Sequence, residues 1–287
     1  MTYPDQSRRQ FFAWRGKQIA YYTAGRSDAP PLLLVHSINA AASSFEFRQT
    51  FAGLSEQYRV TTFDLLGFGG SDRPAQRYSA SEYAELIADL LRAVVGAGAG
   101  VIASSLGAAY TVRAAARNPG LFGPLLLICP TGIRDLAQPA QPGLPYALLY
   151  GPLGDVLFAG LASRPSIRYF LAQQSYYDPA VVTEALIDGF YRAAQQPNAK
   201  YAPICFLTGL LNCHIAEDFA TLTQPIQLVW GRQAEITPFS RAGEFLALNR
   251  QAQIEVIDHA RLSVQDEQPQ LFNQLAGQFF SRSLAAL

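Results

Sequence analysis

The sequence of 287 residues is poor in cysteine, with only Cys129, Cys205 and Cys213. An odd number of widely spaced cysteines does not suit a disulfide framework and is typical of free thiols in a reducing compartment. Cys205, Cys213 and the nearby His214 match no tight metal-ligand spacing, and no fourth ligand is apparent. The sequence therefore predicts neither a disulfide-stabilised fold nor a metal site, and we expect no cofactor.

Charge of one sign and long apolar runs are also lacking. Lysine and arginine together number 22, as do aspartate and glutamate, and there is no basic stripe or acidic tail. The first residues lack the apolar stretch of a signal peptide. The longest apolar run, residues 121–130, is too short to span a bilayer and contains Pro124. We expect a cytoplasmic protein with no membrane span and no nucleic-acid partner, and the oligomeric state stays open.

What the chain does have is an alternation of apolar runs and helical periodicity. The runs typical of buried strands are residues 32–35, 59–63, 100–103, 125–129, 226–230 and 253–257. The helical patterns are residues 41–54, 80–95 (after the candidate cap Ser79), 106–117, 240–248 and 269–284. A short hairpin at residues 11–14 and 19–22 precedes them. This order predicts an α/β fold, a mostly parallel sheet with helices on both faces.

The alternation stops between residues 130 and 223. This stretch begins proline-rich, with Pro139, Pro142, Pro145 and Pro152, and continues as helical pattern with many aromatic residues. We interpret it as a cap inserted over the carboxyl edge of the sheet, with most of its aromatic side chains forming the cap's own core. The predicted division is a first part of the core at residues 1–130, a cap at 131–223 and a second part of the core at 224–287.

One segment carries a candidate nucleophile. Residues 101–116, VIASSLGAAYTVRAAA, run from a strand through a small-x-Ser-x-small turn into a helix. Ala103 and Gly107 are small because the turn is tight and the helix packs close behind the strand. The turn lifts Ser105 out at the sheet edge and exposes the backbone N–H of Leu106, which can stabilise negative charge. The alternative is a serine that merely caps a helix after a strand.

Further motifs, in the same order along the chain, resemble those of the α/β-hydrolase superfamily. His36-Ser37-Ile38 resembles the His-Gly-x loop that supplies the second oxyanion donor, here the N–H of Ile38. FDLLGFGGSDRP resembles the D-x-x-G-x-G-x-S-x-x-P signature, and it is not a dinucleotide fingerprint. VWGRQAEITP resembles the segment that follows the next-to-last core strand of that superfamily, and DEQPQLF resembles the segment that opens its last helix. YYDPAVVTEALIDGFYRAA resembles the cap of haloperoxidase-like and epoxide-hydrolase-like members. The resemblance covers nearly the whole chain and implies an α/β-hydrolase fold with a triad in the order Ser, Asp or Glu, His.

The triad acid is missing at the position that the resemblance implies. Such members read W-G-x-x-D-x-x-x-P, whereas this chain has Ala234 in place of the aspartate. A methyl group cannot accept a hydrogen bond from an imidazole. Glu235, one residue along, is a candidate acid only if the loop re-aims it. Other members carry the acid after the sixth strand, where the first carboxylate of this chain is Asp135.

The triad base is missing as well. The resemblance places it at H-x-x-x-x-E-x-P, and that position holds Leu262, with His259 three residues earlier. A general base needs contact with its proton donor or one bridging water, so we interpret Leu262 and Ala234 as vestigial triad positions. His259 is a candidate base, with a loop-stabilising histidine as the better-supported alternative. His36 is expected to brace backbone groups, and His214 is the remaining candidate.

Three hypotheses about function follow. The first is an atypical member of the superfamily, with a serine at the nucleophile elbow and a degraded triad. It would bind a small apolar or amphipathic molecule between core and cap. It would act either as a binding protein or as an enzyme with non-hydrolytic chemistry, such as a lyase or cyclase reaction. The second is an esterase-like serine hydrolase with a rewired triad of Ser105, His259 or His214, and Glu235. The third is a non-catalytic interaction protein. The polar groups expected in the pocket are those of Ser105, Ile38, Leu106, His36, Ser37, Asn39 and Ser104.

Overall fold

A computed structural model describes residues 9–136 and 144–284, so the predictions for Pro139 and Pro142 lie outside the described residues. Eight strands form one sheet in the order β1-β2-β4-β3-β5-β6-β7-β8. β1 pairs with β2, and β2 with β4, in antiparallel fashion, and the other pairings are parallel. The strands are β1 (Gln10–Trp14), β2 (Lys17–Ala24), β3 (Pro31–Val35), β4 (Arg59–Phe63), β5 (Ala99–Ser104), β6 (Phe122–Ile128), β7 (Ile226–Gly231) and β8 (Gln253–Ile257).

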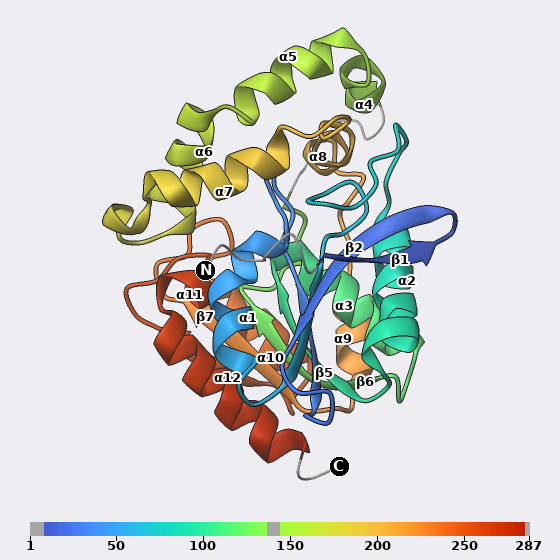
Figure 1. Ribbon diagram of the computed structural model, residues 1–287. Coiled ribbons are helices and arrows are strands. Elements are labelled where there is room, and N and C mark those ends of the chain that lie inside the picture. Colours follow the sequence, from blue (N-terminus) through green and yellow to red (C-terminus); the bar gives the residue numbers. More distant parts are fainter. Residues whose placement is uncertain (1–8, 137–143, 285–287) are drawn as a thin grey trace.

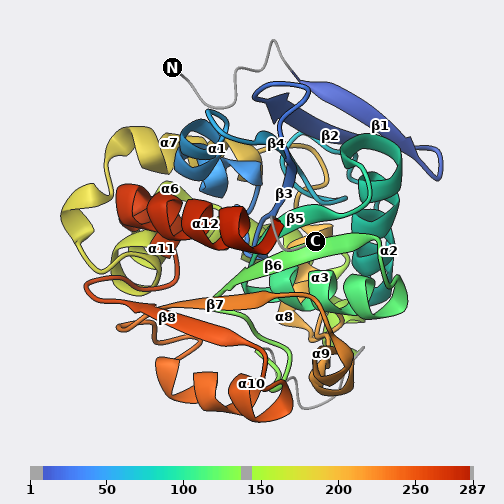
Figure 2. The same cartoon turned by 90° about the horizontal axis from the view of Figure 1, so that it is seen from below.

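Helices cover both faces of this sheet. Figure 2 shows α1 and α12 on one face and α2, α3 and α10 on the other. Their bounds are α1 (Arg48–Leu54), α2 (Ala80–Leu90), α3 (Ser105–Arg117), α10 (Ala242–Leu248), α11 (Val264–Glu267) and α12 (Pro269–Leu284), with a 3-10 turn η6 (Phe239–Arg241) before α10. The predicted fold, a mostly parallel sheet between helices, is confirmed.

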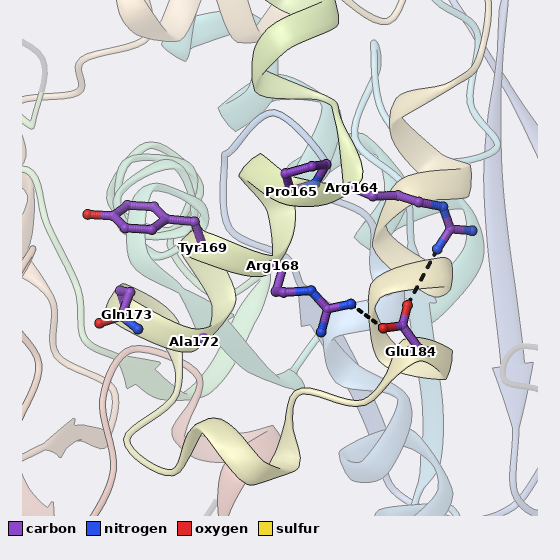
Figure 3. A pocket seen from close by; sticks show the side chains of 7 residues that line it. All are labelled: Arg164, Pro165, Arg168, Tyr169, Ala172, Gln173 and Glu184. Carbon is purple, nitrogen blue, oxygen red and sulfur yellow. Dashed lines mark hydrogen bonds and ion pairs between the residues drawn. The ribbon is translucent and has the colours of Figure 1, made fainter.

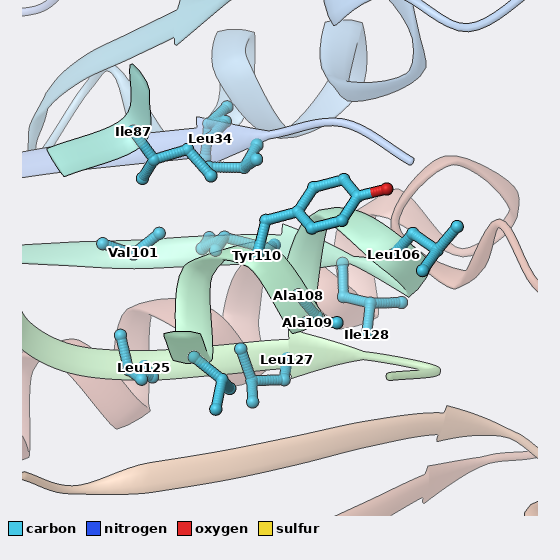
Figure 4. Close-up of a cluster of buried hydrophobic side chains, with 14 of the residues drawn as sticks. Leu34, Ile87, Val101, Leu106, Ala108, Ala109, Tyr110, Leu125, Leu127 and Ile128 are labelled. Atoms are coloured by element: carbon cyan, nitrogen blue, oxygen red, sulfur yellow. The ribbon is translucent and has the colours of Figure 1, made fainter. Parts of the chain in front are cut away.

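The central strands are buried on both faces. Every residue of β5 and of β6 is buried, and Figure 4 shows Val101 and Leu127 of these strands packed with Ile87 of α2 and Tyr110 of α3. A strand covered by helices on both sides reads as a continuous apolar run, which is why the sequence pattern was informative here. This packing fixes the end of β5, from which the candidate site begins.

Two helices differ most from their predicted extents. The helix predicted at residues 41–54 starts later, with the 3-10 turn η2 (Ser44–Phe47) leading into α1. The side chain of Asn39 accepts a hydrogen bond from the N–H of Ala41 (2.8 Å), and Ser43 Oγ accepts one from the N–H of Phe45 (3.4 Å). These local bonds compete with helix formation. The pattern at residues 80–95 is α2 followed by a π-helical turn, η3 (Leu91–Val95), and Ser79 caps α2 as predicted.

The described part of the segment between β6 and β7 is mostly helical, and Figure 1 shows α4 to α8 over one end of the sheet. Its elements are α4 (Leu144–Leu149), α5 (Pro152–Leu161), α6 (Arg164–Phe170), η4 (Leu171–Ser175), η5 (Pro179–Val181), α7 (Glu184–Ala194), α8 (Tyr201–Leu207) and α9 (Ala216–Thr221). Tyr176 and Phe190 are buried in a small apolar cluster of this segment, whereas Tyr169 is exposed. The division into core and cap at residues 131 and 223 stays a prediction. Within residues 9–136 and 144–284, no helix is long and apolar enough to cross a membrane.

Candidate functional site

Ser105 lies at the sharp turn between β5 and α3. Its backbone φ is +52°, a left-handed conformation that is rare for a residue with a side chain. Such a conformation costs roughly 1–3 kcal/mol and persists only where the surrounding packing enforces it. Here β5 is buried in front of the turn and α3 is buried behind it. The strain therefore falls on the residue that the sequence motif singles out.

Gly107 allows α3 to approach the loop after β3. A Cβ atom at this position would lie 2.3 Å from the carbonyl oxygen of His36 and 3.1 Å from that of Val35. Any side chain here would push the first turn of α3 away from the loop that carries Ile38. The glycine therefore brings the two segments with the predicted oxyanion donors close together.

We expect Gly107→Ala to destabilise the protein by about 1–3 kcal/mol, because the added methyl group has no room against rigid backbone atoms. A matched control is Gly243→Ala in α10, where an added Cβ would meet nothing within 4 Å. That variant should gain up to about 1 kcal/mol from its higher helix propensity. Urea unfolding of both variants measures the difference. Equal stabilities would contradict the close approach.

His36 is fully buried and braces two loops. Its Nδ1 lies 2.6 Å from the carbonyl oxygen of Ser37, and its Nε2 lies 3.0 Å from the backbone nitrogen of Leu65. A carbonyl can only accept and an N–H can only donate, so the proton sits on Nδ1 and the imidazole is neutral. Burial lowers the pKa of His36, which agrees with a neutral ring. Both ring nitrogens are thus occupied by backbone groups.

A cavity of about 210 Å³ opens beside Ser105. Its walls come from the ends of β3, β5 and β6 and from η4, α7, α8 and the β8–α11 loop. The polar side chains of its lining include Ser37, Asn39, Glu46, Ser104, Ser105 and Gln265. Ile38, whose N–H is a predicted oxyanion donor, also lines it. Its apolar lining includes Leu136, Phe170, Phe190, Phe206, Ile236 and Leu262. The structure thus brings most of the residues that the sequence singled out to one cavity.

A second hollow, of about 440 Å³, lies on the outside of α6 and α7. Figure 3 shows Arg164 and Arg168 reaching Glu184 across it. These side chains are about half exposed, and exposed ion pairs contribute little. The hollow holds none of the predicted site residues, so the smaller cavity beside Ser105 is the candidate site.

No histidine lines that cavity. The chain has three histidines, and both ring nitrogens of the first, His36, contact backbone groups. The side chain of His214 is 69% exposed, with Nε2 3.2 Å from Oδ1 of Asp135. His259 is exposed, and its ring centroid lies 5.4 Å from that of Tyr177. The described lining therefore provides no imidazole close to Ser105.

The two loops that would carry the remaining triad members lie side by side. The N–H of Gln233, after β7, donates to the carbonyl of Ala260, after β8, at 3.1 Å. Ala234 is buried, and Leu262 lines the cavity. Glu235 is 68% exposed and lies 3.5 Å from the guanidinium of Arg261, outside the cavity lining. The structure therefore does not bring Glu235 to Ser105.

Glu46 is a site residue that the sequence reasoning missed. Its Oε1 accepts a hydrogen bond from the N–H of Ser37 (2.7 Å), and its Oε2 lies 2.6 Å from Ser37 Oγ. The pKa of Glu46 is raised to about 7, chiefly by burial and to a smaller extent by the nearby charge of Asp266, while the hydrogen bonds from Ser37 oppose the shift. Its place between Phe45 and Phe47 was the available signal, because a residue flanked by two large apolar side chains is rarely on an open surface.

Gln265 is a second missed residue. Its side chain is almost completely buried and lines the cavity, and its Oε1 has no hydrogen-bond partner. The next residue, Asp266, is held by an ion pair with Arg48 (2.5 Å) and by a hydrogen bond from the hydroxyl of Tyr176. This network joins α11 to α1 and to the end of η4, and so fixes the position of Gln265. Among the described residues, no cluster of His, Cys, Asp or Glu could hold a metal ion.

Comparison with known proteins assigns the family. The profile of the alpha/beta hydrolase family matches residues 32–275. The chain belongs to the alpha/beta hydrolase family. It is 23% identical over 263 residues to an uncharacterized hydrolase, YugF, of Bacillus subtilis, which covers 90% of this chain and 92% of that protein.

The chain is also 26% identical over 267 residues to the non-heme chloroperoxidase of Streptomyces lividans, covering 88% of this chain and 93% of that protein. The crystal structure of a serine hydrolase involved in carbazole degradation superposes with a TM-score of 0.80 at 19% identity, covering 95% of this chain and 98% of that one. At this identity the structural match supports the alpha/beta hydrolase fold alone.

Proposed function

We propose that this alpha/beta hydrolase family member binds a small, largely apolar molecule in the cavity beside Ser105 and does not hydrolyse it through a Ser-His-acid triad. The observation that carries the proposal is the absence of an imidazole from the described cavity lining, where Leu262 stands instead. A serine without a base keeps its proton and is a weak nucleophile. What remains is a pocket with an apolar wall beside Ser105 and Ile38, where the N–H groups of Ile38 and Leu106 are the expected oxyanion donors.

The pocket's chemistry indicates the kind of ligand. The N–H groups of Ile38 and Leu106 would bind a carbonyl oxygen, as the oxyanion donors of this fold do. Phe170, Phe190 and Leu262 would contact an aromatic or branched apolar body. An apolar cavity of roughly 150 Å³ is enough for benzene, so about 210 Å³ suits a one-ring carbonyl compound. In this proposal the α4–α9 segment acts as a cap that encloses the ligand.

Labelling with a fluorophosphonate probe tests the nucleophile. We expect no adduct on the peptide that contains Ser105, because such probes react with serines that a base has activated. A triad-containing serine hydrolase treated in parallel shows that the probe is active. Strong labelling of Ser105 that is lost in His259→Ala or His214→Ala would favour a hydrolase with a rewired triad instead.

Thermal unfolding with acetophenone tests the binding. A ligand that binds only the folded state should stabilise it by about 2.7 kcal/mol at a concentration of a hundred times its Kd. Leu262→Trp should abolish this gain by filling the cavity. The matched control is Leu271→Trp on α12, where the side chain is exposed and outside the cavity lining. The same gain in wild type and Leu262→Trp would place the binding elsewhere.

A further inference from the structure

We propose that Glu46 and Gln265 form a polar subsite that binds the hydrogen-bond donor of a neutral ligand head group, and that a carboxamide is the head group it fits best. The inference rests on the proposed function, because it describes one end of the same cavity. It adds the chemical class of the head group, which neither the family nor the cavity's apolar wall specifies.

Gln265 supplies the unpaired acceptor. Its Oε1 is buried, faces no donor among the described residues and belongs to a side chain that lines the cavity. A buried carbonyl oxygen without a partner is costly, and a ligand N–H or O–H that reaches it removes that cost. The ion pair of Asp266 with Arg48 fixes the short helix α11 on which Gln265 lies. The acceptor is therefore held in place before a ligand arrives, which favours selective binding.

Glu46 supplies a second acceptor close by. The turn η2, which carries Glu46, packs against α11, which carries Gln265. Ser37 holds both carboxyl oxygens of Glu46, yet each oxygen of a carboxylate has capacity for another hydrogen bond. Ser37 also precedes Ile38, so the proposed carbonyl-binding N–H and these acceptors belong to one part of the cavity. A carboxamide presents a carbonyl oxygen and an N–H on one planar group and matches both.

The charges of the cavity disfavour an anionic head group. Glu46 lines it and Asp266 lies close enough to raise the pKa of Glu46. Among the described lining residues there is no lysine or arginine, and the nearby Arg48 is already paired with Asp266. A ligand carboxylate would leave water for a cavity whose described lining offers no lysine or arginine as a counter-ion, which opposes binding. The subsite therefore selects a neutral amide over the corresponding acid.

Three probes of one size separate these possibilities: benzamide, acetophenone and benzoate, each titrated into wild type by calorimetry. We expect benzamide to bind at least roughly tenfold more tightly than acetophenone, because a site built around a hydrogen bond rejects the analogue that lacks the donor. Benzoate should show no binding. Gln265→Met, which removes the acceptor at similar volume, should bring benzamide to the affinity of acetophenone. Gln278→Met, exposed on α12, is the matched control.

The outcomes distinguish the two proposals. Equal affinities of benzamide and acetophenone in wild type, or tighter binding of benzoate, would overturn the subsite while leaving the binding function in place. Failure of all three probes to bind would reject the proposed function and the subsite with it. An amide preference that survives Gln265→Met would assign recognition to other groups and overturn the role of Gln265. The comparison among the three probes needs no variant, so a folding defect in Gln265→Met does not remove the test.

Discussion

The double variant Ala234→Asp, Leu262→His is expected to hydrolyse p-nitrophenyl acetate with a kcat/KM at least ~100-fold above that of wild type, since a full triad is worth several orders of magnitude beyond an oxyanion hole alone. The strained turn at Ser105 and the adjoining Ile38 loop are already in place. The loops that carry Ala234 and Leu262 are joined by the bond from Gln233 to Ala260. An imidazole from the second loop can then be oriented by a carboxylate from the first.

The controls isolate each part of this gain. Leu262→His alone should give a smaller gain, because nothing fixes the tautomer of the new imidazole or stabilises its charge. Ala234→Asn, Leu262→His matches the double variant in size and lacks the carboxylate. Adding Ser105→Ala to the double variant should remove the gained activity entirely. A folded double variant with no activity above wild type would show that these positions, or Ser105, are not arranged as a triad requires.

The sequence predicted the fold well where apolar periodicity is decisive. The strand at residues 253–257 and the helix at 269–284 agree with β8 and α12 to the residue. In contrast, the helix predicted to start at residue 41 begins as the 3-10 turn η2 at Ser44 and as the α-helix α1 only at Arg48, because the side chains of Asn39 and Ser43 bind nearby backbone groups. The apolar periodicity indicates which face of an element is buried, but it does not depend on hydrogen bonds between a side chain and the nearby backbone, so it cannot predict them.

For the candidate site, the motifs singled out Ser37, Ile38 and Ser105, and these three residues line one cavity, while their roles stay predictions. The sequence analysis did not identify Glu46 and Gln265 as site residues, because their burial depends on contacts between segments that are distant in the sequence. Gln265 stands in a run of polar residues, QDEQPQ, that resembles an exposed helix start. It is buried because Asp266 pairs with Arg48 and Tyr176, from elements far away in the chain. A local pattern cannot report that kind of burial.

The same burial should make the stability of the protein depend on pH through Glu46. Its pKa rises from an ordinary value of 4.5 to about 7 in the folded state. The folded state therefore binds the proton more tightly than the unfolded state. The contribution of Glu46 is fully present below its unfolded pKa and is lost as pH rises through the folded pKa. A shift of this size corresponds to about 3 kcal/mol.

Glu46→Gln removes this dependence and keeps the shape of the side chain. Its amide oxygen can still accept the N–H of Ser37, and its amide N–H₂ can donate to Ser37 Oγ. The unfolding free energy of the variant minus that of wild type should be about 3 kcal/mol larger at about pH 8 than at about pH 4.

Urea unfolding at the two pH values measures this difference, and Glu56→Gln, at an exposed position, is the matched control. Asp266 and Arg48 are common to both proteins, so only the part of their titration that depends on the charge of Glu46 remains in the difference. A difference that is the same at both pH values would mean that Glu46 ionises in the folded protein as it does in the unfolded chain, and the buried carboxyl would then face more water than its contacts indicate.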